Sequence, residues 1–194
     1  MDAQTPSPTP APAPAAPLDA AAWIEAAMDV LAEGGIDAVR VDPLAKRLGV
    51  TRGSFYWHFK DRAALHAAML KEWRARASYT VFNRVERSIE SAEDRLKRIF
   101  ALPKSSPRSV RAANIELAIR MWAQRDREAA KAVRHIDHTR LRYFTDLYRQ
   151  HGLADEEAKG RAYLLYASLI AQSLFADDYR YVDYAQKQLL APPK

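Results

Sequence analysis

The chain has 194 residues, of which 48% are hydrophobic and 28% charged, with a net charge of +6 and no cysteine. These values are typical of one globular domain, or two small ones, with enough apolar residues for a core. The absence of cysteine excludes disulfides, thiolate metal sites and cysteine nucleophiles. The longest uncharged run after the first 18 residues, residues 162–176, is too short and too polar to span a bilayer.

The basic surplus lies in the middle of the chain. Residues 84–149 carry sixteen Lys or Arg against nine Asp or Glu, whereas residues 19–83 carry nine against eight. A basic surplus indicates an anionic partner such as nucleic acid only where the charges gather on one face. The net charge therefore cannot by itself locate a binding site.

The first 18 residues differ from the rest. They hold six of the eleven prolines and five alanines. Such a segment buries too little apolar surface to offset the entropy of ordering it, so we predict a disordered tail over residues 1–18. It lacks the basic start and the apolar stretch of a signal peptide, and we expect a cytoplasmic protein.

After the tail, apolar residues recur at helical spacing, and runs of β-branched residues are absent, which predicts an all-α fold. Glycines, prolines and capping residues divide the chain into about nine helices. We expect helices over residues 19–33, 42–48, from 51, from 61, and over 91–102, 109–124, 126–150, 155–176 and 182–190. The expected capping residues are Asp42, Thr51 and Asp61. The helix over 109–124 has two apolar lines, through Met121 and through Ile119, and is predicted to be buried on two sides.

The stretch from residue 41 to residue 60 predicts a helix-turn-helix, with a short helix, a tight turn at Gly49 and a second short helix. Leu44 gives the first helix an inner face, and Phe55 and Phe59 hold the second helix against the core. We therefore expect a helix-turn-helix domain over residues 19–65. A helical domain for effector binding and dimerisation would follow over residues 66–194.

The outward side chains of the second short helix are hydrogen-bond donors, and no carboxylate occurs from residue 51 to residue 60. Hydroxyl, imidazole and ammonium groups bind phosphates, and an arginine can bond guanine at two points in the major groove. This composition is typical of a DNA recognition helix. The residues that we expect to contact DNA are Arg40, Thr51, Arg52, Gly53, Ser54, Tyr56, Trp57, His58 and Lys60.

Residues 19–73 resemble the DNA-binding domain of the TetR family of transcriptional regulators. The motifs that carry the resemblance are Gly34-Gly35-Ile36, Leu44-Ala45 through Gly49-Val50, Gly53-Ser54-Phe55-Tyr56-Trp57-His58-Phe59 and Lys60-Asp61-Arg62 with Leu65. The rest of the chain is similar to the family in length, helical content and the neighbourhood of residues 120–123. The resemblance implies an N-terminal three-helix domain that binds DNA and a helical domain that binds a ligand.

The resemblance also implies roles for single residues. Tyr56 and His58 would bind phosphates, Lys60 would bond a phosphate from the start of the fourth helix, and residues 52–54 would face bases or the nearby backbone. The alternatives are an ordinary core aromatic at Tyr56 and a structural histidine at His58.

Three further positions leave alternatives open. The family often has Thr at the position of Val41, whose side chain cannot bond a phosphate. The alternatives are a substitute contact from Arg40 or Lys46 and the loss of one contact. Trp57 could pack as a core aromatic. Arg52 could be solvated without touching a base.

The second half of the chain must supply any dimer interface. Helix-turn-helix proteins commonly bind two half-sites as dimers. We expect the apolar helix over 155–176 to pair with its copy through one face, which contains Ala162, Leu165 and Leu169. The alternative is a monomer in which this helix is buried.

An effector pocket would be apolar with a few polar groups. The residues expected to line it are Asn114, Trp122, His138, Tyr163 and Gln172, although each could instead be structural. His135 and His138, with Asp137 between them, resemble half of a metal site but lack further ligands, so we expect no metal and no cofactor.

These features predict a DNA-binding transcriptional regulator, most simply a repressor, that binds a palindromic operator as a homodimer and is released by a small-molecule effector. The alternatives are a constitutive DNA-binding protein without an effector and a small helical enzyme. The sequence has no G-x-S-x-G, no H-E-x-x-H and no phosphate-binding glycine loop, so we do not expect an enzyme.

Overall fold

The computed structural model describes residues 18–86, 91–102, 106–174 and 180–191, and every regular element in these ranges is a helix. The all-α prediction is confirmed, while residues 1–17 of the predicted tail lie outside the described residues. The helices are α1 (Ala20–Gly34), η1 (Ile36–Ala38), α2 (Val41–Leu48), α3 (Arg52–Tyr56), α4 (Arg62–Glu86), α5 (Ala92–Ala101), α6 (Pro107–Ala123), α7 (Arg127–Gln150), α8 (Asp155–Ala171) and α9 (Arg180–Leu189).

Most helix ends follow local chemistry that the sequence shows directly. The carboxylate of Asp19 accepts the amide of Ala22 at 2.9 Å at the start of α1, and Asp61 and Asp126 cap α4 and α7 in the same way. Gly49 ends α2 with φ 67° and ψ 28°, a left-handed conformation that favours glycine.

Three helix ends differ from the predictions. α2 begins at Val41, because the amide of Leu44 donates to the carbonyl of Arg40, so Asp42 lies in the first turn and is not the cap. Thr51 precedes α3, but its side chain makes no capping hydrogen bond. α8 ends at Ala171, short of the predicted end at residue 176, which lies outside the described residues.

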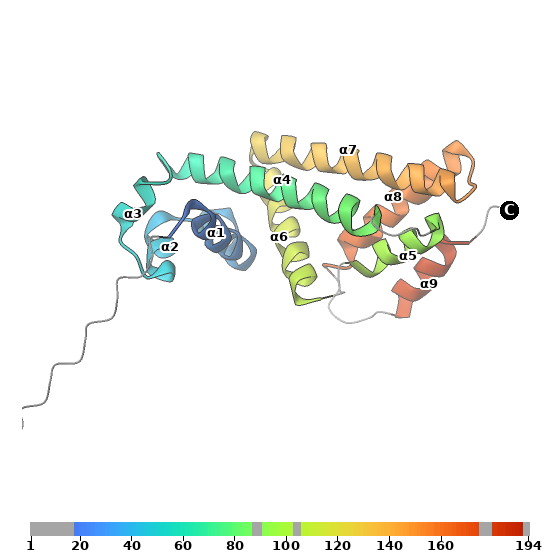
Figure 1. Cartoon of the computed structure of the whole chain (residues 1–194), viewed down its shortest axis with the longest axis horizontal. Coiled ribbons are helices and arrows are strands. Elements are labelled where there is room, and N and C mark those ends of the chain that lie inside the picture. The colour runs from blue at the N-terminus through green and yellow to red at the C-terminus, as the bar shows by residue number, and fades with distance from the viewer. Residues whose placement is uncertain (1–17, 87–90, 103–105, 175–179, 192–194) are drawn as a thin grey trace, which may run out of the picture.

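The molecule is elongated, with α2 and α3 at one end and α5 and α9 at the other (Figure 1). α7 packs against α8, and α6 lies between α1 and α7. α4 begins beside α3 and runs along α7 into the second half. The predicted domain boundary after residue 65 falls in the first turn of α4, so this one helix belongs to both halves.

Two apolar cores share α7. The first, around Trp23 and Leu65, joins α1 to α4 with α6 and the first half of α7. The second, around Phe144 and Leu165, joins α5, α7 and α8. None of the described helices combines the length and the apolar character needed to cross a bilayer.

Only one of the two predicted apolar lines of α6 is buried along its whole length. Ile115, Ile119 and Trp122 lie in the first core, as predicted. On the second line, however, Val110 is 44% and Met121 64% exposed, which corrects the prediction. The packing of α1 and α7 against α6 leaves these two side chains exposed.

Candidate nucleic-acid interface and interior cavity

The position of α3 is set by a cluster of aromatic side chains. The Phe55 ring is fully buried and lies edge-on to Trp23, with 5.3 Å between ring centroids, and 5.4 Å from Phe59. The turn after α2 is closed by a hydrogen bond from the amide of Val50 to the carbonyl of Ala45. Because α3 has only five residues, these contacts rather than its own length hold it in place.

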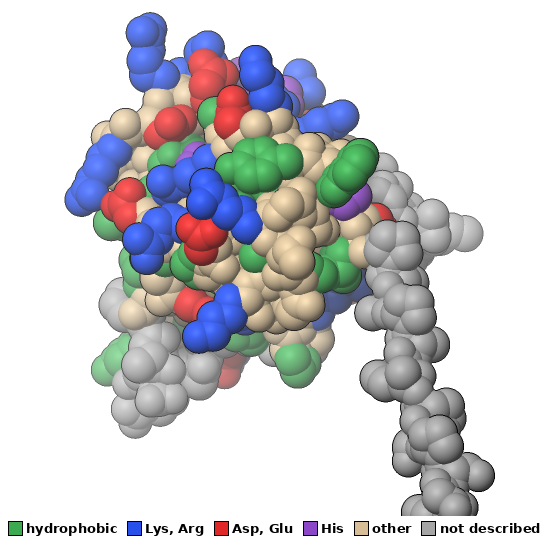
Figure 2. Space-filling view, turned by 90° about the vertical axis from the view of Figure 1, so that its left-hand side faces the viewer, with side chains coloured by type: hydrophobic (Ala, Val, Ile, Leu, Met, Phe, Trp, Pro, Cys, Tyr) green, Lys and Arg blue, Asp and Glu red, His purple; other side chains and the backbone are tan. Residues whose placement is uncertain are grey.

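The predicted DNA contacts lie together at the α2–α3 end of the molecule, which faces the viewer in Figure 2. The exposed members of this set are Arg40, Thr51, Arg52, Gly53, Tyr56, Trp57, His58 and Lys60, whereas Ser54 is half-buried. Trp57 is 88% exposed and Tyr56 51%, so neither is the core aromatic of the alternative interpretation. Figure 2 shows Lys and Arg side chains on this face with apolar side chains exposed among them.

Arg52 is positioned by two neighbours. Its Nε lies 3.6 Å from Asp42 Oδ1 on α2, and its Nη2 lies 3.4 Å from the Tyr56 hydroxyl. Tyr56 first, and then the charge of Asp42, raise the pKa of the Arg52 guanidinium. Arg52 is therefore exposed but held across the helix-turn-helix, not merely solvated.

Two nearby cations serve the fold instead. Arg47 makes a two-pronged ion pair with Glu33, at 2.6 and 2.7 Å, and Arg62 donates to the Ile36 carbonyl at 2.8 Å. Val41 is half-buried, while both of its proposed substitutes, Arg40 and Lys46, are exposed.

A cavity of about 520 Å³ lies behind this end of the molecule, between α1, α4, α5, α6, α7 and α8. Its apolar wall includes Met28, Trp73, Ile99 and Ile170. A volume of this size and an apolar lining with a few polar groups are typical of small-molecule sites.

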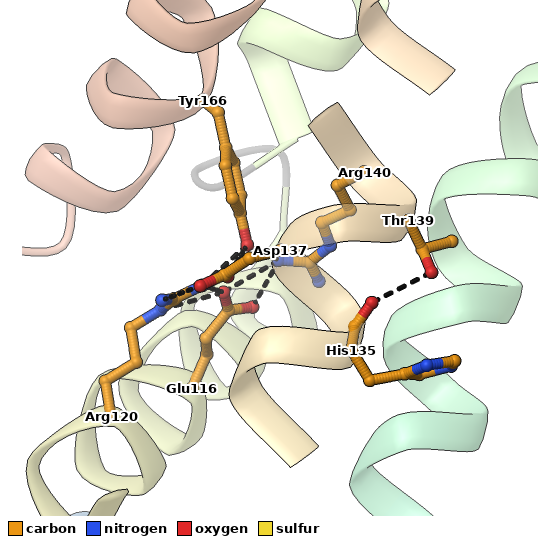
Figure 3. A network of polar contacts seen from close by, with 7 residues as sticks. All are labelled: Glu116, Arg120, His135, Asp137, Thr139, Arg140 and Tyr166. Carbon is orange, nitrogen blue, oxygen red and sulfur yellow. Dashed lines mark hydrogen bonds and ion pairs between the residues drawn. The ribbon is translucent and has the colours of Figure 1, made fainter. Parts of the chain in front are cut away.

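Five polar residues beside the cavity form what we call the buried charge cluster: Glu116 and Arg120 from α6, Asp137 and Arg140 from α7, and Tyr166 from α8 (Figure 3). All of them except Asp137 line the cavity. Arg140 Nη1 donates to both Glu116 oxygens, at 2.7 and 2.8 Å. Arg120 Nη2 donates to Asp137 Oδ1 at 2.6 Å and to Glu116 Oε1 at 3.0 Å. The Tyr166 hydroxyl donates to Asp137 at 2.7 Å.

The buried charge cluster is electrically balanced, with two guanidinium groups and two carboxylates. Burial opposes ionisation of Glu116, but Arg140 and Arg120 together hold its pKa below the ordinary value. Burial raises the pKa of the Tyr166 hydroxyl, which stays protonated at neutral pH and can donate. The cluster therefore joins three helices without leaving an unpaired charge.

None of the five predicted ligand residues lines this cavity, and their role in ligand binding stays a prediction. Asn114 and Trp122 border a second hollow between α1 and α6. His138 and Tyr163 are exposed, and Gln172 is buried outside the cavity wall. The five residues were predicted because they are polar and lie near apolar residues in the sequence. The composition of the cavity wall depends instead on which faces of the helices meet in the fold.

The sequence contained a signal for the buried charge cluster. Glu116 and Arg120 are four residues apart, so they share one face of α6, close to the buried Ile115 and Ile119. A charge pair beside a buried apolar stripe indicates an interior ion pair.

The histidines of the half metal site do not converge with Asp137. His135 and His138 are exposed, while Asp137 is bonded to Arg120 and Tyr166. Across the described ranges, no three His, Asp or Glu side chains lie close enough to hold a metal ion.

The predicted dimer face of α8 is occupied within the chain. Ala162 and Leu165 are fully buried in the second core, and Leu169 is half-buried and lines the cavity. These residues face α7, which packs along α8, so they are not accessible to a partner. The opposite face of α8 exposes Tyr163 by 64% and Leu164 by 55%.

The geometry of α1 to α3 defines a helix-turn-helix domain with an exposed polar second helix. Residues 24–69 match the family of bacterial regulatory proteins described as the tetR family. A tetracycline repressor protein of class A from transposon 1721 of Escherichia coli is 46% identical over 46 residues. That match covers 24% of this chain and about a fifth, 21%, of the repressor. Residues 24–69 of this chain are thus similar to the helix-turn-helix domain of the TetR family.

Solved structures share the fold over most of the chain. A transcriptional regulator from Rhodococcus sp. Rha1 superposes with a TM-score of 0.72 at 22% identity, over 89% of this chain and 94% of its own. A transcriptional regulator from Saccharomonospora viridis, solved in complex with choline, has a TM-score of 0.72 at 18% identity, over 88% and 92% of the two chains. At this identity the likeness establishes the fold alone.

Proposed function

We propose that this protein is a transcriptional regulator that binds a palindromic operator through α2 and α3 as a homodimer and represses transcription. The observation that carries the proposal is the exposure of Tyr56, Trp57, His58 and Lys60 beside the buried Phe55. A run of donors with no carboxylate from residue 51 to residue 60 suits phosphate and base contacts. The match of residues 24–69 to the TetR family supports the same role.

The proposed regulator responds to a small molecule in the interior cavity. The cavity is bounded by α1 of the helix-turn-helix domain as well as by α4 to α8, so an occupant would touch both halves. A neighbour of the same fold was solved with choline, which supports ligand binding by this architecture. A ligand weakens DNA binding only if it binds better to the arrangement of helices that fits DNA less well.

The proposed dimer uses the exposed side of α8, not the side that the sequence suggested. Tyr163 and Leu164 on α8, and Leu174 just beyond it, are each more than half exposed, as are Tyr181 and Tyr184 on α9. Large apolar side chains exposed together mark an interaction surface. Leu164→Glu should give monomers in sedimentation without loss of helical structure, and a stable dimer would move the interface elsewhere.

DNA binding is tested with the full chain and duplexes that it selects from a random-sequence library. Lys60→Ala should weaken binding to all sequences and lower the slope of log affinity against log salt by about 0.9, because one phosphate contact is lost. The matched control is Lys97→Ala on α5, a lysine whose exposed ion pair with Glu93 lies at the opposite end of the molecule. Failure of the chain to enrich any sequence would overturn the proposal.

Base recognition is tested at Arg52. Arg52→Ala should reduce affinity roughly tenfold to a hundredfold for the selected sequence and relax the preference at one base pair. Arg134→Ala, which removes an exposed arginine of α7, is the control. A loss of equal size for every base would assign Arg52 to phosphate only.

A further inference from the structure

Two arginines of the cavity wall tie the helix-turn-helix domain to the second half. Arg111 of α6 donates from Nε to Asp29 at 2.6 Å and from Nη2 to Glu25 at 3.0 Å, and both carboxylates belong to α1. Arg76 of α4 also contacts Glu25. The cavity is lined by both Arg76 and Arg111, whereas their two α1 carboxylates lie outside its wall.

A third arginine at this side of the cavity has no counter-ion among the residues that the structure describes. Arg108 lies one turn before Arg111 on α6 and also lines the cavity. It is exposed, and no carboxylate within the described ranges pairs with it. Arg76, Arg108 and Arg111, which we call the arginine rim, therefore present three guanidinium groups to the cavity space with the carboxylates of α1 behind two of them.

The remaining wall determines the rest of the ligand. The buried charge cluster on the other side is already balanced, so it offers no net charge to an occupant. Between the cluster and the rim the wall is apolar, with Trp73, Ile99, Leu102 and Ile115 among its residues. A guanidinium favours carboxylates and phosphates over other partners.

We propose, on the basis of the proposed function above, that the cavity binds an anionic amphiphile, with its apolar body on the wall and its anionic group at the arginine rim. The anion competes with Glu25 and Asp29 for Arg111 and Arg76. Binding thereby loosens the ion pairs that hold α1 against α6 and α4, and this exchange couples the cavity to the helix-turn-helix domain.

The ligand class is tested by calorimetry on the full chain without DNA, with three probes of equal length: decanoate, decan-1-ol and decylamine at neutral pH. Decanoate should bind about tenfold more tightly than decan-1-ol, which is the size of effect expected for one hydrogen bond to a charged group. Decylamine should bind most weakly. Binding of decylamine as tight as that of decanoate, or no binding of any probe, would overturn the inference.

The location of the anion is tested at Arg108. Arg108→Ala should lower the affinity for decanoate about tenfold and leave that for decan-1-ol unchanged, because only the anion uses the rim. Arg142→Ala, which removes an exposed arginine of α7 outside the cavity wall, is the matched control for net charge. Equal losses in the two variants would assign the effect to long-range charge and refute the rim.

The coupling is tested with Asp29→Asn and Glu25→Gln, whose wild-type side chains are only half-buried. Each variant should bind decanoate more tightly, since one competitor for the rim is gone. The factor by which decanoate weakens binding to the selected DNA should fall toward one. Glu72→Gln removes a carboxylate that pairs with Arg76 within α4, and it should leave this factor unchanged.

These measurements separate the two proposals. Decanoate binding without DNA tests the rim even if the protein recognises no DNA. Conversely, DNA selection tests the proposed function even if decanoate does not bind. A wild-type protein that binds both with no mutual effect would keep the ligand class and refute the competition for Arg111, because coupling between two sites is reciprocal.

Discussion

At the α2–α3 end, the donors point outward from an apolar core, whereas around the cavity two arginines and two carboxylates lie inside the protein. Lys60 and Arg52 are exposed and available to a partner. Arg120 and Arg140 are only 16% and 13% exposed, and both are paired with the carboxylate of Glu116. In the first region charge serves recognition. In the second region, the charged side chains of the buried charge cluster join helices to one another. Only the arginine rim is left there to bind a ligand.

The largest loss of folding stability is expected at Glu116. Glu116→Gln leaves Arg120 and Arg140 with one carboxylate fewer in a buried site and should lower the free energy of unfolding by about 3–5 kcal/mol. Urea unfolding measures the change. Glu93→Gln, which breaks an exposed ion pair with Lys97 on α5, should leave the urea midpoint unchanged. A small effect at Glu116 would show that the interior charges contribute no more than surface ones.

The same variant gives a pH dependence with a definite sign. The pKa of Glu116 in the folded chain lies below its ordinary value of 4.5. Its ionised form therefore stabilises the fold fully above pH 4.5 and ceases to do so as the pH falls through the lower, folded value. The difference in unfolding free energy between wild type and Glu116→Gln should narrow below pH 4.5. A constant difference down to about pH 3 would contradict this.

At the α2–α3 end, Phe55 and Trp57 allow the buried and the exposed side of the helix-turn-helix to be compared. Phe55 is fully buried against Trp23, so Phe55→Ala should cost about 3–5 kcal/mol of unfolding free energy. Trp57 is 88% exposed, and Trp57→Ala should change stability by no more than about 0.5 kcal/mol while weakening DNA binding. Equal destabilisation by the two variants would remove Trp57 from the proposed interface.

A smaller effect is expected at the hydroxyl of Tyr166. Tyr166→Phe removes a donor to Asp137 at 2.7 Å and an acceptor for Arg120 at 2.6 Å but keeps the ring in place. Hydrogen bonds to charged groups contribute about 1.5–3 kcal/mol, and the loss should fall in this range. Thermal unfolding would check it, with Tyr163→Phe on the exposed face of α8 as the control that should show no change.

The smallest losses of stability are expected from removing helix caps, and they should be equal in the two regions. Asp19 caps α1 and Asp126 caps α7 through bonds of 2.9 and 2.8 Å to backbone amides. Asp19→Ala and Asp126→Ala should each cost about 1 kcal/mol. Because a cap is a local interaction, a large difference between the two variants would mean that one of them also disturbs packing between helices.

The sequence predicted the first region well because its determinants are local. Capping by Asp61, the turn at Gly49, and the alternation of buried Phe55 with exposed Tyr56 all depend on residues a few positions apart. The predicted caps Asp42 and Thr51 were wrong, because neither side chain makes the capping hydrogen bond. The same reasoning worked for the lengths of α5 to α7, whose caps are also local.

The sequence could not predict the cavity or the dimer face. The wall of the cavity comes from six helices. The hydrogen-bond partner of Arg111 in this wall is Asp29, which lies 82 residues away in the sequence. Ala162 and Leu165 share an apolar face of α8, but apolar periodicity alone does not say whether α7 or a second chain covers it. The direction of a face is decided by tertiary packing.

The continuity of α4 has a mechanical consequence. From Arg62, beside the helix-turn-helix, to Arg76, at the cavity, the helix rises about 21 Å over 14 residues at 1.5 Å per residue. If it acts as a stiff lever, a tilt of about 5° at Arg76 displaces Arg62 by roughly 2 Å. In a symmetric pair both levers would swing, so the displacement between the two α3 helices would double. Adjacent half-sites on DNA are about 34–36 Å apart. A change of roughly 4 Å in the separation of the two α3 helices would therefore move them out of register with the two half-sites.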